Sequence, residues 1–521
     1  MPDAMKFERL LTGLSTKKGA IFVLSDGKPV RHSHAGLAAD VARAQEQLSR
    51  WNVKAGVRVG MFAPNSYTYI VYDLALIGLN AIAVPFTDDF AGFLNPELVE
   101  KYSLALLLLS KNASHCFDRN DRYVAFLGEE NQNVRALDRT PYGSDEADDL
   151  CLAFSSGSAG GLKGLLISRS GAESTLPPVV EAIGVSHRDR LLLFLPMSNF
   201  QQRMMYYAAI WYDVDIAVTD YTHLYPAMKV LQPTILIAPP VLYQLIHTRF
   251  SAALRSGWKR LAARLIPWLP ELSLRQRIAR HLFKDVWGIF GPRMRLLISG
   301  MAPLNRNTIY FFDSLQLPLS ESYGMVEAGS LTYRPPFSRK YGSVGKPLRG
   351  VTMSFEDDGE IIIHREKFLS RRYFQCAPGE NENTFIGAAR LATGDIGQFD
   401  ADGFLNLLGR KKELIITPGG YKIHPEVLEG EINACVDVAQ SVIFQRQGVS
   451  HLTCVVVPGP DRSDGVAARI RKYVEDLMTG RKIRIGEVLF AEEPFSAQNG
   501  MLRPNLKLNR KAITAKYAAA S

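Results

Sequence analysis

The sequence has few cysteines, and their placement excludes two common stabilising frameworks. They are odd in number, lie far apart and include no Cys-x-x-Cys pair; they are Cys116, Cys151, Cys376, Cys435 and Cys454. Disulfide frameworks of small secreted proteins and structural zinc sites both need cysteines at closer, paired spacings. We therefore expect neither, and a reducing cytoplasm fits this cysteine usage best.

Long hydrophobic runs are also missing. The longest apolar stretches, such as residues 104–109, are much shorter than the roughly 20 residues that cross a bilayer. Residues 1–6 lack the charged start and apolar run of a secretory signal. We therefore expect a cytoplasmic protein without a transmembrane helix.

Repeats, low-complexity segments and a strong charge excess are absent as well. Without a repeat of 20–50 residues, solenoids and propellers are excluded. Lys+Arg 61 against Asp+Glu 52 gives a net charge of +9, too small an excess for a nucleic-acid-binding composition, although it suits anionic ligands or lipid headgroups. With 47% hydrophobic residues, the 521-residue chain has enough apolar surface for more than one core, which predicts at least two domains.

The first part of the chain alternates between strand and helix patterns. Residues 57–63, 67–79 and 81–86 read as strand, helix and strand, a βαβ unit that implies a parallel sheet. Apolar runs at 191–196 and 234–238, and a third at 295–298, are each followed by turn residues and a helical pattern. These runs extend the same α/β architecture.

The pattern changes after about residue 340. Short alternating segments such as 360–364 predict antiparallel β-structure, and the tail after Gly409 mixes helix and strand patterns. We place a boundary at 410–413. The predicted fold class is therefore α/β: a large N-terminal domain (1–410) of layered α/β subdomains plus a β-rich subdomain, and a small C-terminal α+β domain (411–521).

Residues 255–284 form an unusually basic segment. A single acidic residue, Glu271, accompanies two tryptophans and eight cations; the cations are Arg255, Lys259, Arg260, Arg264, Arg275, Arg277, Arg280 and Lys284. A basic amphipathic helix with aromatic residues can lie on an anionic membrane, and a solvated helix face is the simpler alternative. Peripheral contact with the inner face of the membrane therefore stays open.

A loop rich in glycine and serine follows the apolar residues 151–153. Residues 154–164 combine small residues, which let backbone N–H groups approach a polyphosphate, with the positive charge of Lys163. The loop is not a Walker motif, because Leu162 stands where that motif needs glycine and Gly164 follows the lysine. A phosphate-binding loop is one interpretation, and a flexible surface turn is the other.

Further motifs follow in a fixed order downstream. They are residues 299–304, 321–327, 342–347, 393–395, 409–413, 499–501 and 506–510. Together with the loop at 154–164 they resemble the adenylate-forming superfamily of acyl-CoA synthetases, peptide-synthetase adenylation domains and luciferases. The likeness covers nearly the whole chain. Residues 409–420 and 506–510 are most similar to the long-chain acyl-CoA synthetase branch.

The resemblance implies which residues would bind ATP. The β- and γ-phosphates would be held by Ser155, Ser156, Gly157, Ser158, Gly160 and Lys163. The adenine pocket would be formed by Gly300, Met301, Ser322, Tyr323 and Gly324. Asp395 and Arg410 would bind the ribose hydroxyls. Read without the resemblance, Tyr323 could be a core residue and Asp395 a turn residue.

The resemblance also implies three catalytic residues, Lys163, Glu327 and Lys507. A carboxylate must attack the α-phosphorus of ATP while pyrophosphate leaves, so negative charge has to be spread over a metal and cationic donors. Glu327 would bind Mg²⁺, which favours carboxylate oxygen. Lys507 would reach the charge that develops at the α-phosphate, with Lys511 as the nearest alternative lysine.

Further implied roles concern the acid substrate and domain motion. Asn199, Gly324 and Met325 would contact the acid. Lys412 would be the hinge about which the small domain rotates between adenylation and thioester formation. A plain surface loop at Lys412 is the alternative.

Several positions depart from the family pattern. Val326 stands where the family commonly has a threonine that contacts the α-phosphate, and valine cannot donate a hydrogen bond. Asn199 replaces a usual histidine and cannot carry charge near neutral pH. Ala159, Arg169 and Arg503 replace a usual threonine, histidine and threonine, respectively. These changes indicate a specialised member of the family.

The function we predict is ATP-dependent activation of a fatty or aryl carboxylic acid to an acyl adenylate, followed by thioester formation with CoA. The alternatives are transfer to the phosphopantetheine of an acyl carrier protein, activation of nitrite as in diazotising members, or a non-catalytic nucleotide-binding role. The predicted ligands are ATP, Mg²⁺ and CoA, without nucleic acid. The identity and chain length of the acid stay open.

Overall fold

The computed structural model describes most of the chain. The described residues are 5–86, 94–111, 117, 121–129, 133–139, 148–156, 162–251, 257–417, 421–446, 448–459, 465–481, 483–496, 498–502 and 508–518. For residues 155, 156 and 162 the backbone alone is described.

A seven-stranded sheet contains the predicted βαβ unit. Its strand order is β18-β8-β7-β4-β3-β5-β6. The strands are β3 (Arg58–Phe62), β4 (Ile82–Pro85), β5 (Leu104–Leu109), β6 (Val124–Phe126), β7 (Asp149–Ser156), β8 (Leu162–Ser168) and β18 (Ser370–Phe374). Strands β3 and β4 are parallel and joined by helix α3 (Tyr67–Gly78), which confirms the prediction. β8 and β18 extend this sheet in antiparallel orientation.

A nine-stranded sheet follows, with the order β15-β14-β13-β12-β11-β9-β10-β1-β2. Its strands are β1 (Ala20–Ser25), β2 (Lys28–Ser33), β9 (Arg190–Leu193), β10 (Asp215–Val218), β11 (Ile235–Ala238), β12 (Leu296–Ser299), β13 (Leu319–Met325), β14 (Gly329–Arg334) and β15 (Lys346–Pro347). The three apolar runs predicted as strands are β9, β11 and β12, and all three are parallel.

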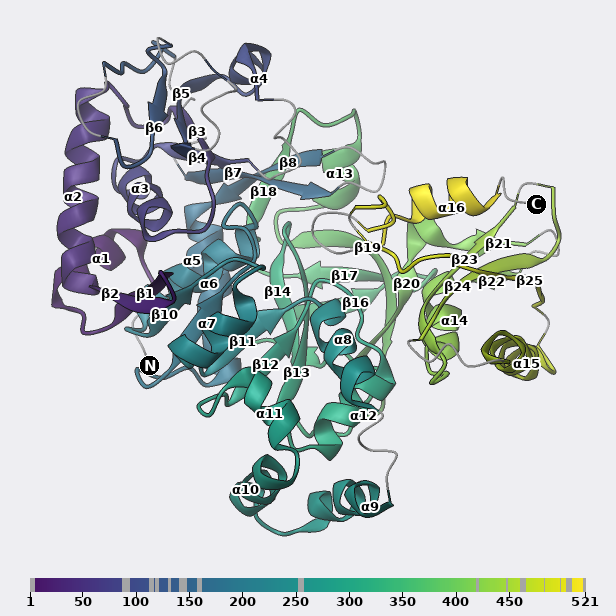
Figure 1. The fold of residues 1–521 in the computed structure, drawn as a ribbon. Helices are drawn as coiled ribbons and strands as arrows, with labels where there is room; N and C mark the ends of the chain where they lie inside the picture. Colours follow the sequence, from purple (N-terminus) through teal and green to yellow (C-terminus); the bar gives the residue numbers. More distant parts are fainter. Residues whose placement is uncertain are drawn as a thin grey trace.

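Helices cover both faces of these sheets. Leu191 and Leu193 of β9 face one apolar core while Leu192 faces another, so the sheet is buried on both sides, as parallel sheets are. Helices α5 (Arg169–Ile183) and α6 (Phe200–Trp211) lie between the two sheets (Figure 1).

The other helices of this part surround the sheets. They are α1 (Phe7–Thr12), α2 (His34–Arg50), α4 (Pro96–Lys101), α7 (Leu224–Leu231), α8 (Pro240–Phe250), α9 (Gly257–Leu265), α10 (Leu272–Leu282), α11 (Lys284–Phe290) and α12 (Arg306–Ser314). α9 and α10 extend from one end of the body (Figure 1). Among the described residues, no helix has both the length and the hydrophobicity needed to cross a membrane.

A four-stranded antiparallel sheet confirms the β-structure predicted after residue 340. Its order is β16 (Thr352–Phe355), β17 (Glu360–His364), β19 (Arg390–Phe399) and β20 (Leu405–Arg410). The short helix α13 (Glu380–Thr384) precedes β19. This sheet and the two larger ones confirm the predicted α/β class.

The C-terminal elements have apolar cores of their own. They comprise β21 (Ile415–Ile416) paired with β22 (Lys422–Ile423), helices α14 (Pro425–Ile432), α15 (Val466–Met478) and α16 (Arg510–Ala518), and a three-stranded sheet of β23 (Val438–Gln445), β24 (Leu452–Pro458) and β25 (Ile485–Phe490). Asn305 and Asn307, at the start of α12, donate to the backbone oxygens of Asn433 and Ala434, both at 2.6 Å. These bonds attach the C-terminal elements to the larger body.

Candidate active site

The described ends of the predicted phosphate loop belong to β7 and β8, which pair in antiparallel orientation. Ser155 is the cross-strand partner of Lys163, and Ser156 is the partner of Leu162. Lys163 therefore lies on a regular strand, β8. Gly157, Ser158 and Gly160, together with Ala159, lie outside the described residues.

Lys163 faces residues from a distant part of the sequence. Its ammonium lies 2.5 Å from Oε1 of Glu380, the first residue of α13. The same ammonium lies 5.1 Å from the centre of the Tyr373 ring, a cation–π distance. Tyr373 is on β18, which pairs with β8 and so brings this ring next to the lysine.

Tyr373 links Lys163 to Glu327, the predicted metal ligand. Its hydroxyl donates a 2.8 Å hydrogen bond to Oε1 of Glu327, a residue that is only 9% exposed. Burial, and then the neighbouring Glu327 carboxylate, raise the pKa of Tyr373, which keeps the hydroxyl protonated as a donor. The structure thus brings Lys163 and Glu327 to the two sides of one tyrosine. Sequence reasoning missed Tyr373, which falls in none of the motifs.

A second cluster joins the predicted adenine and ribose residues. The Tyr323 hydroxyl donates to Oδ2 of Asp395 at 2.7 Å, and Nε of Arg410 lies 3.3 Å from Oδ1 of the same carboxylate. Asp395 and Arg410 are cross-strand partners on β19 and β20. Burial, and then Asp395, raise the pKa of Tyr323 well above its ordinary value. These three predicted residues therefore meet around one carboxylate.

Gly324 occupies a position that only glycine can fill. The pairing of β13 with β14 shifts register between Tyr323 and Gly324, and a Cβ at Gly324 would lie 2.6 Å from the backbone oxygen of Gly329. On the same strand, the Ser322 hydroxyl donates to the backbone oxygen of Thr332 at 3.0 Å. Glycine at 324 thus lets the strand that carries Tyr323 turn tightly toward Glu327.

The predicted acid-contacting residue Asn199 lies beside the predicted adenine-pocket residue Met301. Asn199 begins α6, where its Oδ1 accepts from the Gln201 backbone N–H at 3.0 Å, and its Nδ2 lies 3.9 Å from the Met301 sulfur. Met301 follows Gly300 just after β12 and has a positive φ of 72°. The turn after β12 and the start of α6 therefore meet.

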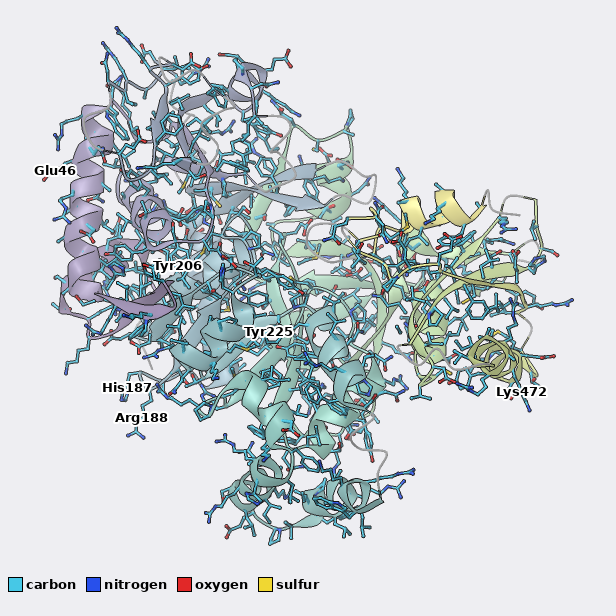
Figure 2. The ribbon with its side chains drawn as sticks, viewed as in Figure 1. Glu46, His187, Arg188, Tyr206, Tyr225 and Lys472 are labelled. Carbon is cyan, nitrogen blue, oxygen red and sulfur yellow. The ribbon has the colours of Figure 1, made fainter. Side chains whose placement is uncertain are left out.

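A buried polar cluster fixes the helix that Asn199 begins. Arg203 of α6 pairs with Asp73 of α3, and both side chains are fully buried. The hydroxyls of Tyr206 and Tyr207 both donate to Oδ2 of Asp73, the latter at 2.7 Å. Figure 2 shows Tyr206 in the interior of the body. Because breaking a buried ion pair is costly, this cluster holds α6 against α3.

The departures from the family pattern have different surroundings. Val326 packs against the main core, and its backbone oxygen accepts from the Ser370 hydroxyl at 2.8 Å. Met325, which is predicted to contact the acid and is not a departure from the family pattern, packs against the core of the antiparallel sheet. Arg169 donates to the backbone oxygen of Ile77 at 2.9 Å, and burial lowers its pKa, so it connects α5 to the end of α3. Arg503 lies outside the described residues.

The predicted hinge residue Lys412 lies in the short 3-10 turn Lys411–Glu413, between β20 and β21. Its neighbour Lys411 bridges Asp358 at 2.7 Å and Glu360 at 2.6 Å, and these carboxylates raise the pKa of Lys411. Lys411 thus fastens one side of the turn to β17 and the residues before it.

Lys507 lies outside the described residues, so its predicted role stays a prediction. The nearby Arg510, at the start of α16, pairs with Glu413 at 3.0 Å and with Glu429 at 2.5 Å. The alternative lysine, Lys511, follows on the same helix. The chain after residue 507 is therefore attached next to the predicted hinge.

Two carboxylates lie at the Lys163–Tyr373 cluster: Glu327 accepts from the Tyr373 hydroxyl, and Glu380 pairs with Lys163. In the part of the chain that the structure describes, no three His, Cys, Asp or Glu residues gather as a metal-binding group. Mg²⁺ at phosphoryl-transfer sites commonly uses only one or two carboxylates together with substrate phosphates. Glu327, which is linked to Lys163 through Tyr373, fits that mode of binding.

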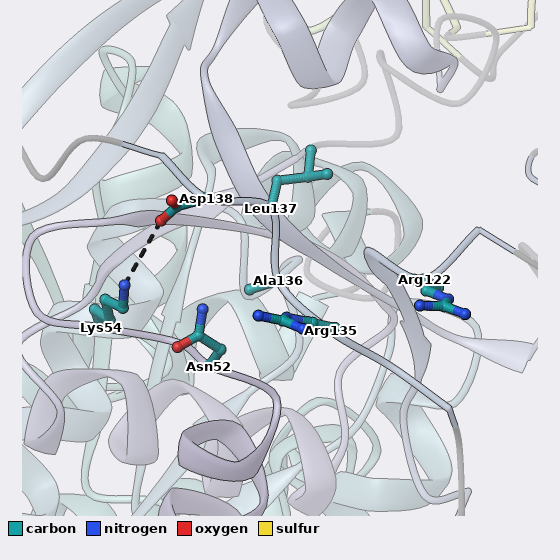
Figure 3. Close-up of a pocket in the computed structure, with 7 residues that line it drawn as sticks. All are labelled: Asn52, Lys54, Arg122, Arg135, Ala136, Leu137 and Asp138. Atoms are coloured by element: carbon teal, nitrogen blue, oxygen red, sulfur yellow. Dashed lines mark ion pairs between the residues drawn. The ribbon is translucent and has the colours of Figure 1, made fainter.

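A pocket of about 460 Å³ lies elsewhere in the fold (Figure 3). It is lined by Asn52, Lys54, Arg122, Arg135, Ala136, Leu137 and Asp138. It lies beside β6, at one edge of the seven-stranded sheet, whereas β8 with Lys163 lies near the opposite edge. Lys54 and Asp138, 3.6 Å apart, pair across it. This pocket is therefore separate from the predicted site.

Comparisons with known proteins show which proteins this chain resembles in sequence and in fold. The chain is 26% identical to the long-chain-fatty-acid–CoA ligase FadD15 of Mycobacterium tuberculosis, over 99% of this chain and 94% of that protein. The ATP-bound structure of MatB from Rhodopseudomonas palustris has the same fold, with a TM-score of 0.75, 20% identity and 99% of each chain covered. The anthranilate CoA ligase AuaEII in complex with anthranoyl-AMP also has a TM-score of 0.75, at 17% identity over 100% of this chain and 99% of that chain.

The family assignment rests on a match over most of the chain. The sequence model of a family described as AMP-binding enzyme matches residues 14–367, which include Lys163, Tyr323 and Glu327. With this match, and with a shared fold along nearly the whole chain, the protein belongs to the AMP-binding enzyme family of adenylate-forming ligases.

Proposed function

We propose that this protein activates a fatty acid with ATP to give an acyl adenylate and pyrophosphate, and then forms a thioester with CoA. The observation that carries the proposal is the pair of clusters Lys163–Tyr373–Glu327 and Tyr323–Asp395–Arg410. Tyr323 lies on β13, and Glu327 lies in the turn that joins β13 to β14. A triphosphate site and a nucleoside site on one connected framework are what adenylation requires.

Each cluster suits one part of the nucleotide. Lys163 would contact the β- and γ-phosphates, and Glu327 would hold Mg²⁺, which supplies positive charge to the leaving pyrophosphate. Asp395 would accept from the ribose hydroxyls, with Arg410 holding its carboxylate in place. The acid would approach between Asn199 and Met325, where its carboxylate can attack the α-phosphorus.

The later part of the reaction requires a second arrangement of the chain. Lys507 would stabilise the charge that develops between the carboxylate and the α-phosphate. The residues after the 410–413 boundary would then rotate about Lys412 as a separate domain, which would remove Lys507 and admit CoA. The apolar cores formed by the C-terminal elements themselves support such a rotation.

The substrate class follows from the relatives. FadD15 and a human relative that is 22% identical are both named long-chain-fatty-acid–CoA ligases. We therefore propose a long-chain fatty acid as the substrate and CoA, rather than a carrier protein, as the acceptor. Adenylation of nitrite has no support among these relatives.

Product analysis by mass spectrometry tests the proposal. The protein is incubated with ATP, Mg²⁺ and a panel of fatty and aryl acids, with or without CoA. We expect acyl-AMP without CoA and acyl-CoA with it. Lys163→Met should abolish both products, while Lys472→Met, on the exposed face of α15 (Figure 2), should leave them unchanged. Failure of every acid to give an adenylate would contradict the proposal.

We also propose that α9 and the turn after it contact an anionic membrane. Their apolar side chains point outward: Trp258 is 60% exposed, Leu261 and Leu265 are each 57% exposed, and Trp268 is 75% exposed. The spacing of Trp258, Leu261 and Leu265 places them on one helix face, and the cations of α9, which are Lys259, Arg260 and Arg264, lie outside that apolar face. Such a face can insert into the headgroup region while its cations contact anionic lipid.

Vesicle flotation separates this proposal from a plain solvated surface. The double variant Trp258→Ala with Trp268→Ala should lose binding to vesicles of phosphatidylglycerol and phosphatidylcholine. Tyr225→Ala, which removes an exposed aromatic from α7, should bind like the wild type. Equal binding by the wild type and the double variant would contradict membrane contact through α9.

A further inference from the structure

Lys163 already has an anionic partner within the protein. Its ammonium lies 2.5 Å from Oε1 of Glu380, and the two side chains are 24% and 30% exposed, respectively. The partly exposed carboxylate oxygen therefore takes a hydrogen-bonding position on Lys163 that a phosphate oxygen would need.

The position of Glu380 is fixed by the strand that carries Tyr373. The next residue, Asn381, accepts a 2.8 Å hydrogen bond at Oδ1 from the Tyr373 backbone N–H. The other Glu380 oxygen, Oε2, accepts from the Ala377 backbone N–H at 3.3 Å. Glu380 is thus held at the same cluster that contains Tyr373 and Glu327.

The predicted hinge adds a second, weaker positive charge to the surroundings of the Glu380 carboxylate. The hydrogen bond and charge of Lys163, and more weakly the charge of Lys412, lower the pKa of Glu380. Glu380 is therefore ionised near neutral pH and lies in the field of both lysines.

We propose that Glu380 is an internal competitor for the β- and γ-phosphates: its carboxylate occupies Lys163 until a triphosphate displaces it, and it recaptures Lys163 as pyrophosphate leaves. The inference rests on the proposed role of Lys163 in phosphate binding. It assigns to Glu380 a function in nucleotide discrimination and product release. A ligand without β- and γ-phosphates has no such competitor, so AMP binding is independent of Glu380.

Calorimetric titration of Glu380→Gln with ATP, pyrophosphate and AMP, each with Mg²⁺ and without acid, tests this directly. A partly exposed ion pair contributes up to about 1 kcal/mol, so we expect ATP and pyrophosphate to bind about two- to fivefold more tightly. AMP affinity should stay unchanged. The matched control is Glu382→Gln, on the same short helix, which should bind all three ligands like the wild type.

A double-mutant cycle identifies Lys163 as the group in competition. In a Lys163→Met background, Glu380→Gln should no longer strengthen ATP binding. The inference is overturned if Glu380→Gln weakens ATP binding or leaves it unchanged. It is also overturned if the substitution strengthens AMP binding as much as ATP binding, or strengthens ATP binding equally in the Lys163→Met background. Weaker ATP binding would mean that Glu380 positions Lys163 for the phosphate.

Glu380→Asp is the control for a folding defect, because it keeps the negative charge on a shorter side chain. Its affinity for ATP should lie between those of the wild type and Glu380→Gln. The titrations measure binding without turnover, so their results separate the proposed competition by Glu380 from the proposed adenylation activity. A protein that binds ATP as expected but adenylates no acid contradicts only the proposed function. A protein that binds no ATP contradicts both.

Discussion

Replacing Tyr373 by phenylalanine removes one hydroxyl from the centre of the candidate site. The ring stays in place, so the cation–π contact with Lys163 at 5.1 Å is preserved. The change deletes the 2.8 Å hydrogen bond to Oε1 of Glu327. Glu327 is nearly buried, so water cannot readily replace the lost donor. The variant therefore removes the donor that orients the predicted metal ligand, together with a side-chain hydrogen bond between Tyr373 and Thr384.

The magnitude follows from the kind of bond that is lost. A hydrogen bond to a charged group contributes roughly 1.5–3 kcal/mol, and each 1.4 kcal/mol corresponds to about tenfold. Loss of a group that orients a metal ligand typically costs about 10- to 100-fold in metal affinity or activity. We expect kcat/KM for ATP at limiting Mg²⁺ to fall about tenfold and to recover partly at high Mg²⁺.

The assay is acid-dependent pyrophosphate release, followed over a range of Mg²⁺ concentrations. Tyr225→Phe removes an exposed hydroxyl from α7 and should leave the kinetics unchanged. A Tyr373→Phe enzyme within twofold of the wild type at limiting Mg²⁺ would refute the idea that Tyr373 positions Glu327. A tenfold loss that high Mg²⁺ does not relieve would also refute it.

Three further substitutions test the framework around the site. Gly324→Ala should cost roughly 1–3 kcal/mol and lower the melting temperature, because its Cβ would meet backbone at 2.6 Å; Gly430→Ala, in α14 with open space around it, should not. Burial lowers the pKa of His247 to about 4 in the folded protein, whereas its pKa in the unfolded chain is about 6.5. The free energy of unfolding should therefore fall by up to about 3 kcal/mol as the pH decreases from 6.5 to 4, because the buried neutral ring must then become charged. Thermal scans of His247→Asn over this pH range should show a smaller fall. Arg410→Ala, which removes the ion pair at Oδ1 of Asp395 and leaves the Tyr323 hydrogen bond in place, should weaken AMP binding several-fold in calorimetry.

Local patterns in the sequence predicted much of the fold. The unit β3–α3–β4 was predictable because the apolar period changes from strand to helix within 30 residues and Ser66 marks the start of the helix. The β1–β2 hairpin was not predicted, although its turn residues Asp26 and Gly27 both have positive φ, as a tight hairpin turn requires. The dipeptide Asp26-Gly27 is a typical hairpin turn sequence and would have indicated the β1–β2 hairpin.

The site itself was only partly predictable. Motif residues such as Tyr323, Asp395 and Arg410 were named, and the structure brings them together. Tyr373 and Glu380 were not, because their importance arises from the pairing of β18 with β8, about 200 residues apart in the chain. No local period encodes such a pairing. The contacts of Lys163 therefore become visible only in three dimensions.

The central claim is that Lys163, Glu327 and Asp395 bind one nucleotide while an acid attacks it. Exchange of labelled pyrophosphate into ATP measures that step directly, because it requires reversible adenylate formation and no thiol acceptor. The account predicts exchange that depends on a long-chain fatty acid, that is lost in Lys163→Met and that is retained in Lys472→Met. Absence of exchange with every acid of a broad panel, in a protein that binds ATP, would contradict it.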